Sequence, residues 1–293
     1  MRLAAIDIGS NAARLLISDV LYDVKGKPVF SKLNLVRVPL RLGMDVFTEG
    51  KISAARTGMI LQTMKAYKHL MNAYQVEHLI ACATSAMRDA SNANDILRKI
   101  KMETGIDIDV ISGSDEAAIV YESHIAENMD TDHNYLYIDV GGGSTEATCF
   151  SKGNLVFKQS FNIGTIRLLK GMIEDEQWDE MKNTIKSYTK GLDNMVAIGS
   201  GGNINKIFSL SKRKDGKPIS LETLRDYYRE FNSFSLKERM LLYNLREDRA
   251  DVIVPALQIY INLMRWASAE LIYVPKIGLV DGLIQHLYAE INA

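Results

Sequence analysis

The chain has 293 residues, of which 47% are hydrophobic and 24% are charged, and this composition excludes an intrinsically disordered protein. Its 35 Lys and Arg residues nearly balance its 36 Asp and Glu residues, so no overall charge would attract nucleic acid or an anionic membrane. The length exceeds what one small core needs and predicts two domains.

The two cysteines, Cys82 and Cys149, lie in apolar, strand-like runs and are interpreted as core residues in a reducing compartment. Asp7 interrupts the first apolar run before it reaches the length of a signal peptide. The apolar stretch at 252–269 contains polar and charged residues and is not expected to span a membrane. We therefore expect a cytoplasmic protein with neither a membrane nor a nucleic-acid partner.

Alternating and helical hydrophobic patterns predict the order βββαβαβα for the first half of the chain. The expected strands are 2–8, 13–20, 28–38, 78–83 and 107–112, and the expected helices are 53–74, 92–104 and 114–127.

The second half repeats this order, with extra helices before its last strand. The expected strands are 135–140, 145–150, 155–162, 195–199 and 271–275, and the expected helices are 165–171, 175–191, several between 203 and 267, and 279–291. Lys152, Gly153 and Asn154 predict a hairpin turn between two of these strands.

An Asp-x-Gly sequence ends the first strand of each half, at Asp7 and at Asp139. Two matched halves predict an α/β fold made of a duplicated unit, with a cleft between the copies. The expected domains are 1–125 and 126–281, with the last helix, 282–293, packing back on the first domain.

The glycine-rich turn after Asp139 carries the strongest chemical signal. Gly141, Gly142 and Gly143 lack side chains, so their amides can approach a phosphate, and Asp139 and Glu146 flank them. Two carboxylates beside bound phosphate suit Mg²⁺. The alternative is a glycine-rich hairpin with two surface acids, but an Asp that ends an apolar strand is costly without a partner.

Three further segments are weaker candidates for phosphate binding. The turn at 7–11 is a shorter copy of the glycine-rich turn, the segment 198–203 opens a helix with glycines, and 83–88 offers two hydroxyls and Arg88. Each has an ordinary structural alternative, such as a β-turn or tight packing. In the segment 111–117, Ser114 is expected to cap a helix, and the acids that follow, Asp115 and Glu116, would be favoured there by the helix dipole alone.

Taken together, these segments resemble the exopolyphosphatase / guanosine pentaphosphate phosphohydrolase (Ppx/GppA) family in its short two-domain form. The matching sequences are IDIGSN (6–11), ATSAMRDASNA (83–93), ISGSDEA (111–117), IDVGGGSTE (138–146), SFNIGTIRL (160–168), GSGGN (199–203), RADVIVPA (249–256) and GLVDGL (278–283). The resemblance implies two ribonuclease H-like domains of the actin-like ATPase fold, with phosphates bound in the cleft between them.

The resemblance also implies roles for single residues. Glu116 would be the catalytic base, and Asp139 and Glu146, with Asp7, would hold Mg²⁺ or Mn²⁺. The expected phosphate-binding residues are Gly9, Ser10, Asn11, Arg14, Thr84, Ser85, Arg88, Gly141, Gly142, Gly143, Ser144, Arg167, Gly201, Gly202 and Arg249.

Some residues depart from the family pattern. Ala12 stands where a Ser is usual, Asp115 replaces a Glu, and GSGGN stands where GTGGT is typical. Val280 and Asp281 replace Arg-Glu, which questions a contact at the domain junction. Longer members add a C-terminal helical domain that helps to hold long polymers, so we expect a preference for short chains.

The expected activity is release of terminal orthophosphate from inorganic polyphosphate by metal-assisted attack of water. Hydrolysis of the 5′-phosphate of pppGpp would use the same residues. An ATP-dependent kinase and a non-catalytic alarmone or phosphate sensor remain alternatives, although a sensor need not keep a base and metal ligands together. The sequence leaves open whether the protein is a monomer or a homodimer.

Overall fold

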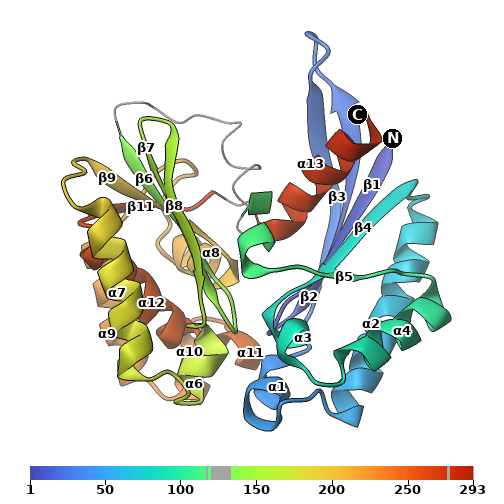
Figure 1. Cartoon of the computed structure of the whole chain (residues 1–293), viewed down its shortest axis with the longest axis horizontal. Coiled ribbons are helices and arrows are strands. Elements are labelled where there is room, and N and C mark those ends of the chain that lie inside the picture. Colours follow the sequence, from blue (N-terminus) through green and yellow to red (C-terminus); the bar gives the residue numbers. More distant parts are fainter. Residues whose placement is uncertain (117, 120–132, 276–277, 293) are drawn as a thin grey trace. The chain divides into compact units, whose positions relative to one another are not determined.

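The computed structural model describes residues 1–116, 118–119, 133–275 and 278–292. The chain divides into two compact units, shown in Figure 1: unit 1 comprises Met1–Ser123 and Gly278–Ala293, and unit 2 comprises His124–Ile277. Each unit has its own mixed β-sheet and its own helices, and each is described below by itself.

Unit 1 is built on a five-stranded sheet with the order β3-β2-β1-β4-β5. Its strands are β1 (Arg2–Ile8), β2 (Ala13–Tyr22), β3 (Pro28–Val38), β4 (His78–Ala83) and β5 (Asp109–Val110). β1 pairs antiparallel with β2 and parallel with β4, so that its carboxyl end, at Asp7, lies beside the carboxyl end of β4. The predicted strands of this half are therefore confirmed, except that 107–112 shortens to β5.

The shortening of β5 has a simple cause. Only Asp109 and Val110 pair with β4, opposite Cys82 and Ala83. Within the predicted strand, Ile108 is buried without joining the ladder, so the apolar pattern that predicted a longer strand reflects packing.

Helices cover both faces of this sheet (Figure 1). They are α1 (Gly43–Glu49), α2 (Ala54–Ala73), α3 (Ser85–Asp89), α4 (Ala93–Thr104) and α13 (Leu279–Ile291). The predictions for α2, α4 and α13 are confirmed to within one or two residues. The short helices α1 and α3 were not predicted, because five to seven residues are too few to establish a helical period.

The helix α13 brings the last residues of the chain onto the first strands. Leu283 and Leu287 pack in one apolar cluster with Leu3 and Leu16 of β1 and β2. Asp281 accepts a hydrogen bond from the Gly278 amide at 2.8 Å and pairs with Lys32 of β3 at 2.6 Å. The unusual Asp281 thus has partners within unit 1. Of the helix predicted at 114–127, residues 114–116 and 118–119 are helical, and the remainder lies outside the described residues; residue 113 is also helical.

Unit 2 contains a six-stranded sheet with the order β10-β11-β9-β6-β7-β8. Its strands are β6 (Asn134–Val140), β7 (Thr145–Ser151), β8 (Asn154–Phe161), β9 (Met195–Ser200), β10 (Ile219–Ser220) and β11 (Leu271–Tyr273). Lys152 and Gly153 both have positive φ, at 51° and 78°, as the predicted hairpin turn requires. The short strand β10 was not predicted.

The helices of unit 2 pack around α12 (Ile253–Trp266), whose inward side belongs to a large apolar cluster with Leu136 and Ile138 of β6. The other helices are α6 (Thr165–Leu169), α7 (Asp175–Thr189), α8 (Gly202–Leu210), α9 (Leu221–Ser233), α10 (Leu236–Leu242) and α11 (Glu247–Ala250). They confirm the predicted set of extra helices before the last strand.

The two sheets share one topology. In unit 2 the order β8-β7-β6-β9-β11 repeats the order β3-β2-β1-β4-β5 of unit 1, with two antiparallel pairs followed by two parallel pairs. The strand β10 adds one antiparallel pair at the edge. The repeat that the sequence predicted is therefore a repeat of the fold.

The structure bears on two further expectations, the state of the two cysteines and the absence of a membrane-spanning segment. Cys82 and Cys149 are both buried and unpaired. Within the described part of the chain, no helix combines the length and the hydrophobicity that crossing a bilayer requires.

Two helical glycines in unit 1 provide a matched test of this packing. A Cβ on Gly282 of α13 would lie 2.4 Å from the Ile119 carbonyl oxygen, whereas a Cβ on Gly58 of α2 would meet no atom within 4 Å. We expect Gly282→Ala to lower the free energy of unfolding by about 1–3 kcal/mol because of overpacking. Gly58→Ala should raise it by about 0.5–1 kcal/mol. Urea unfolding followed by circular dichroism measures both, and equal effects would contradict the described packing of α13.

Candidate active site

In unit 2, two acids face each other across the glycine-rich turn. Asp139, near the end of β6, is paired in register with Glu146 of β7, and one carboxylate oxygen of each lies within 4.8 Å of the other. Glu146 is buried and accepts a hydrogen bond from the Ser160 hydroxyl at 2.8 Å. Like charges directly opposite on neighbouring strands destabilise a sheet, so a cation bound between these two carboxylates would stabilise the pair.

The backbone of the turn is polarised in a way that suits an anion. The carbonyl oxygens of Gly141 and Gly142 accept hydrogen bonds from the first amides of α6, those of Thr165 at 3.0 Å and Ile166 at 2.8 Å. The Gly141 amide donates to the Ser144 carbonyl at 2.9 Å. In the described part of the chain, the amides of Gly142 and Gly143 donate to no protein acceptor. Two free amides on successive glycines are the elements of an anion-binding nest.

Close packing holds this turn in place. A Cβ on Gly164, the residue before α6, would lie 2.5 Å from the backbone of both Gly142 and Gly143, so only glycine fits there. Arg167 of α6 donates from Nε to the Gly143 carbonyl at 2.8 Å. Arg167 therefore contacts the predicted turn, but its Nε donates to a backbone carbonyl there and is not available to a phosphate.

The third glycine segment lies at the same place in unit 2. Gly201 has a φ of 104°, and a Cβ there would lie 2.9 Å from Asp139 Oδ1. The guanidinium group of Arg249 covers Gly202, at 2.6 Å from the position of a Cβ, and donates to Asn203 Oδ1 at 2.7 Å. The structure thus places Gly201 beside the Asp139 carboxylate and Arg249 against the next residue, Gly202.

In unit 1 the equivalent turn has a different charge pattern. The Gly9 amide donates to the Ala12 carbonyl at 3.0 Å, as Gly141 does to Ser144. Asp7 is paired in register with Arg14, where unit 2 pairs Asp139 with Glu146, and Arg14 Nη1 lies 2.6 Å from Asp7 Oδ2. Burial raises the pKa of Asp7, and the Arg14 charge opposes this rise without cancelling it. In unit 1 the positive charge beside the strand-ending carboxylate therefore comes from an arginine of the same unit.

The other predicted residues of unit 1 lie at the ends of β1 and β4. Ser10 and Ser85 share a hydrogen bond between their hydroxyls at 2.8 Å, and the Thr84 amide donates to the Ile8 carbonyl at 3.1 Å. The guanidinium group of Arg88 donates to the Ile111 carbonyl at 2.8 Å.

Glu116 lies in the first turn of a helix, as predicted, but a different serine caps that helix. The Asp115 amide donates to Ser112 Oγ at 3.1 Å, and the Glu116 amide donates to the Ser112 carbonyl at 3.0 Å. The prediction that Ser114 is the cap is therefore wrong, because the helix begins at residue 113. Burial, followed by the charges of Asp7 and Glu116, raises the pKa of Cys82, which places both carboxylates near the end of β4. That Glu116 meets Asp139 stays a prediction.

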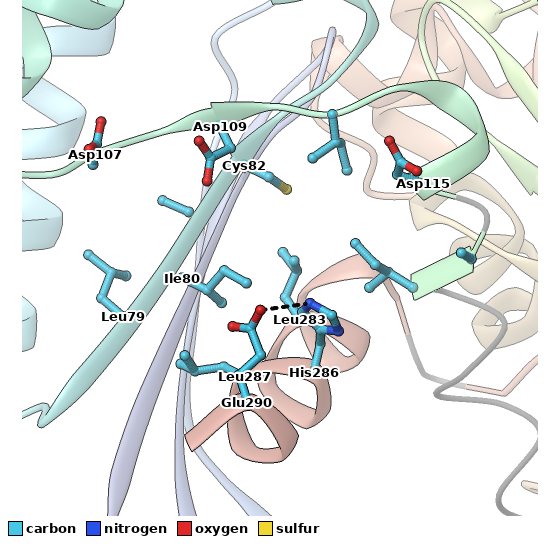
Figure 2. Close-up of a pocket in the computed structure, with 14 residues that line it drawn as sticks. Leu79, Ile80, Cys82, Asp107, Asp109, Asp115, Leu283, His286, Leu287 and Glu290 are labelled. Carbon is cyan, nitrogen blue, oxygen red and sulfur yellow. Dashed lines mark ion pairs between the residues drawn. The ribbon is translucent and has the colours of Figure 1, made fainter. Parts of the chain in front are cut away.

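A separate pocket of about 580 Å³ lies in unit 1 between β4, residues 107–119 and α13 (Figure 2). Its apolar lining includes Leu79, Ile80 and Leu283, and its acidic residues are Asp107, Asp109, Asp115 and Glu290. Glu290 pairs with His286 at 3.3 Å. An acidic pocket repels polyanions, and none of the predicted site residues lines it.

Several residues near the site were not predicted individually. Ser160, Gly164 and Asn203 occur in sequences that resemble the family, but the spacing of these residues did not indicate that they support the turn or Arg249. Tyr260 of α12 donates a hydrogen bond to the Ser200 carbonyl near Asp139, and in the sequence it is indistinguishable from a core residue.

The repeated strand order and the paired Asp-x-Gly turns define the duplicated ribonuclease H-like, actin-like class of α/β proteins. Within that class, the chain belongs to the Ppx/GppA phosphatase family, whose model matches residues 20–290.

Three known proteins illustrate the likeness. The chain is 29% identical to a bifunctional 3-dehydroquinate synthase/phosphatase from Fusobacterium nucleatum, over 93% of this chain and 44% of that protein. It is 28% identical to exopolyphosphatase 1 from Mycobacterium tuberculosis, over 60% of this chain and 50% of that protein. The crystal structure of an exopolyphosphatase from Cytophaga hutchinsonii matches with a TM-score of 0.84 and 26% identity, over 100% and 98% of the two chains. The chain spans about half the length of the first two relatives.

Asp7 makes the pH dependence of stability testable. Because its pKa is raised, its contribution to stability is present below the ordinary carboxyl pKa of about 4 and is lost as the pH rises through the raised value. We therefore expect Asp7→Asn to raise the melting temperature at pH 7 and to flatten its decline as the pH rises above about 4. The Arg14 side chain is 32% exposed, so water still reaches its charge when Asp7 is replaced.

Calorimetry across this pH range is the measurement, and Asp19→Asn is the control. Asp19 pairs with Arg2 at 2.8 Å in a more exposed position, so its loss should change the free energy of unfolding by less than about 1 kcal/mol. A lower melting temperature of Asp7→Asn at pH 7 would mean that the ion pair outweighs burial.

Proposed function

We propose that this chain is a metal-dependent exopolyphosphatase that releases the terminal orthophosphate of inorganic polyphosphate. The observation that carries the proposal is the Asp139–Glu146 pair beside the free amides of Gly142 and Gly143, in a member of a phosphatase family. The likeness to exopolyphosphatases in sequence and in structure supports this substrate.

The donor set suits a divalent cation. Carboxylate oxygens are the ligands that Mg²⁺ and Mn²⁺ prefer, and two of them converge beside amides that can hold phosphate. We propose that Asp139 and Glu146 hold the ion, with Asp7 as a further candidate. When bound, the ion would neutralise charge on the phosphoryl oxygens.

The remaining residues divide the work of binding and proton transfer. The glycine amides and the arginines Arg14, Arg88, Arg167 and Arg249 would bind phosphate oxygens on either side of the bond that breaks. Glu116 would orient a water molecule and accept its proton at a carboxylate oxygen as the water attacks the terminal phosphorus. The proposal requires Glu116 to reach the phosphate that unit 2 holds.

A second candidate substrate is pppGpp, whose 5′-terminal phosphoanhydride bond needs the same groups. The family description covers a wider class of phosphatases than polyphosphate hydrolases alone, which favours including it. A preference for short polyphosphate chains stays a prediction. The buried, unpaired Cys82 and Cys149 support placing the reaction in the reducing cytoplasm.

The direct test is phosphate release from short and long polyphosphates, pppGpp and ATP, with Mg²⁺ or Mn²⁺ and with excess chelator. We expect turnover of polyphosphate that chelator abolishes. Glu116→Gln should lower kcat by at least about 10²-fold, since it removes the general base. Full turnover by this variant would remove Glu116 from the mechanism, and faster turnover of pppGpp would replace polyphosphate as the substrate.

The cation site has its own prediction. Asp139→Asn removes one of two facing charges, so it should raise the melting temperature in metal-free buffer and weaken Mn²⁺ binding at least about tenfold. Electron paramagnetic resonance of free Mn²⁺ measures the affinity. The control is Asp226→Asn, which changes an exposed acid of the same unit that pairs with Arg229 at 3.2 Å. Equal Mn²⁺ affinity in both variants would place the ion elsewhere.

A further inference from the structure

Tyr260 is among the largest fully buried side chains of the protein, with 1% of its surface exposed. It projects from α12 towards the carboxyl ends of β9 and β6. Its hydroxyl donates a hydrogen bond to the carbonyl of Ser200, the last residue of β9. Ser200 is itself paired in register with Asp139.

The phenol ring packs directly under the glycine segment that borders Asp139. A Cβ on Gly199 would lie 3.3 Å from Tyr260 Cε1. A Cβ on Gly201 would lie 3.7 Å from the Tyr260 hydroxyl and 2.9 Å from Asp139 Oδ1. The side of Gly201 on which a Cβ would stand therefore faces both the phenol hydroxyl and the carboxylate, and Gly201 has a φ of 104°.

The Tyr260 hydroxyl is the donor in its contact with Ser200. Burial raises the pKa of Tyr260 well above its ordinary value, and the charges of Asp139 and Glu146 raise it further. The phenol donates its proton to the Ser200 carbonyl, because a carbonyl oxygen can only accept. It cannot contribute a negative charge to a cation site, and it places no third anion beside the two carboxylates.

We propose that Tyr260 is a positioning residue for the cation site: its hydrogen bond to Ser200 fixes the Gly201 backbone against Asp139 and so sets the direction of the Asp139 carboxylate. This inference rests on the proposed function, because it assumes that Asp139 and Glu146 hold a divalent cation. Groups that orient a metal ligand without touching the metal typically contribute 10–100-fold to affinity.

Tyr260→Phe removes only the hydroxyl, and Mn²⁺ binding to the full chain measures the consequence. We expect the Mn²⁺ dissociation constant to rise by about tenfold. In phosphate-release assays, the variant should need more Mn²⁺ for half-maximal activity and should recover most of the wild-type kcat at saturating Mn²⁺, because no reacting group is lost.

Two control variants separate positioning from general destabilisation. Ile259→Val removes one methylene group from a fully buried neighbour on α12, so it should lower the melting temperature and leave Mn²⁺ affinity unchanged. Tyr243→Phe removes a tyrosine hydroxyl that donates to Glu230 at the surface of the same unit, and Mn²⁺ affinity should again be unchanged.

The possible results lead to different conclusions. If the wild-type chain binds no Mn²⁺, both the proposed cation site and the proposed role of Tyr260 are wrong. If the wild-type chain binds Mn²⁺ and Tyr260→Phe binds it equally well, the cation site stands and the positioning role is overturned. Weakened binding in Ile259→Val to the same degree would also overturn it, since loss of stability alone would then explain the effect.

Discussion

The site depends on one unfavourable contact, the placement of Asp139 directly opposite Glu146 on neighbouring strands. Nothing in sheet formation rewards two like charges in this position, and Glu146 is almost completely buried there. The surrounding structure holds the pair together: the Ser160 hydroxyl binds Glu146, and the Gly201 backbone lies against Asp139. A divalent cation bound between the two carboxylates would relieve the repulsion, and phosphate would supply the anions that such a cation retains in its coordination shell.

The two units differ in the residue that lies opposite the strand-ending aspartate. Both turns close with the same backbone hydrogen bond, from the glycine after Asp-x to the residue three positions on. In unit 1 the residue opposite the strand-ending aspartate is Arg14, and in unit 2 it is Glu146. One duplicated scaffold therefore presents a neutralised pair and an anionic pair. The first suits a role in binding phosphate through Arg14, and the second suits a role in binding metal.

The sequence predicted those features that depend on local pattern. Alternating apolar residues located β1 to β4 and β6 to β9, and the repeated Asp-x-Gly identified the duplication before any strand order was known. The sequence did not predict features that depend on tertiary packing. Ile108 looks like a strand residue but packs without a ladder, and Ser112 takes the capping position expected of Ser114. The support of the turn by Gly164 and the hydrogen bond of Tyr260 to Ser200 join residues far apart in the chain.

We propose that one cation and one phosphate bind together at the turn between Asp139 and Glu146. The decisive experiment is a crystal structure with Mn²⁺ and tripolyphosphate, measured at the manganese absorption edge. We expect an anomalous peak within bonding distance of both carboxylates and a phosphate group on the amides of Gly142 and Gly143. Manganese bound elsewhere, or a phosphate chain that avoids these amides, would contradict it.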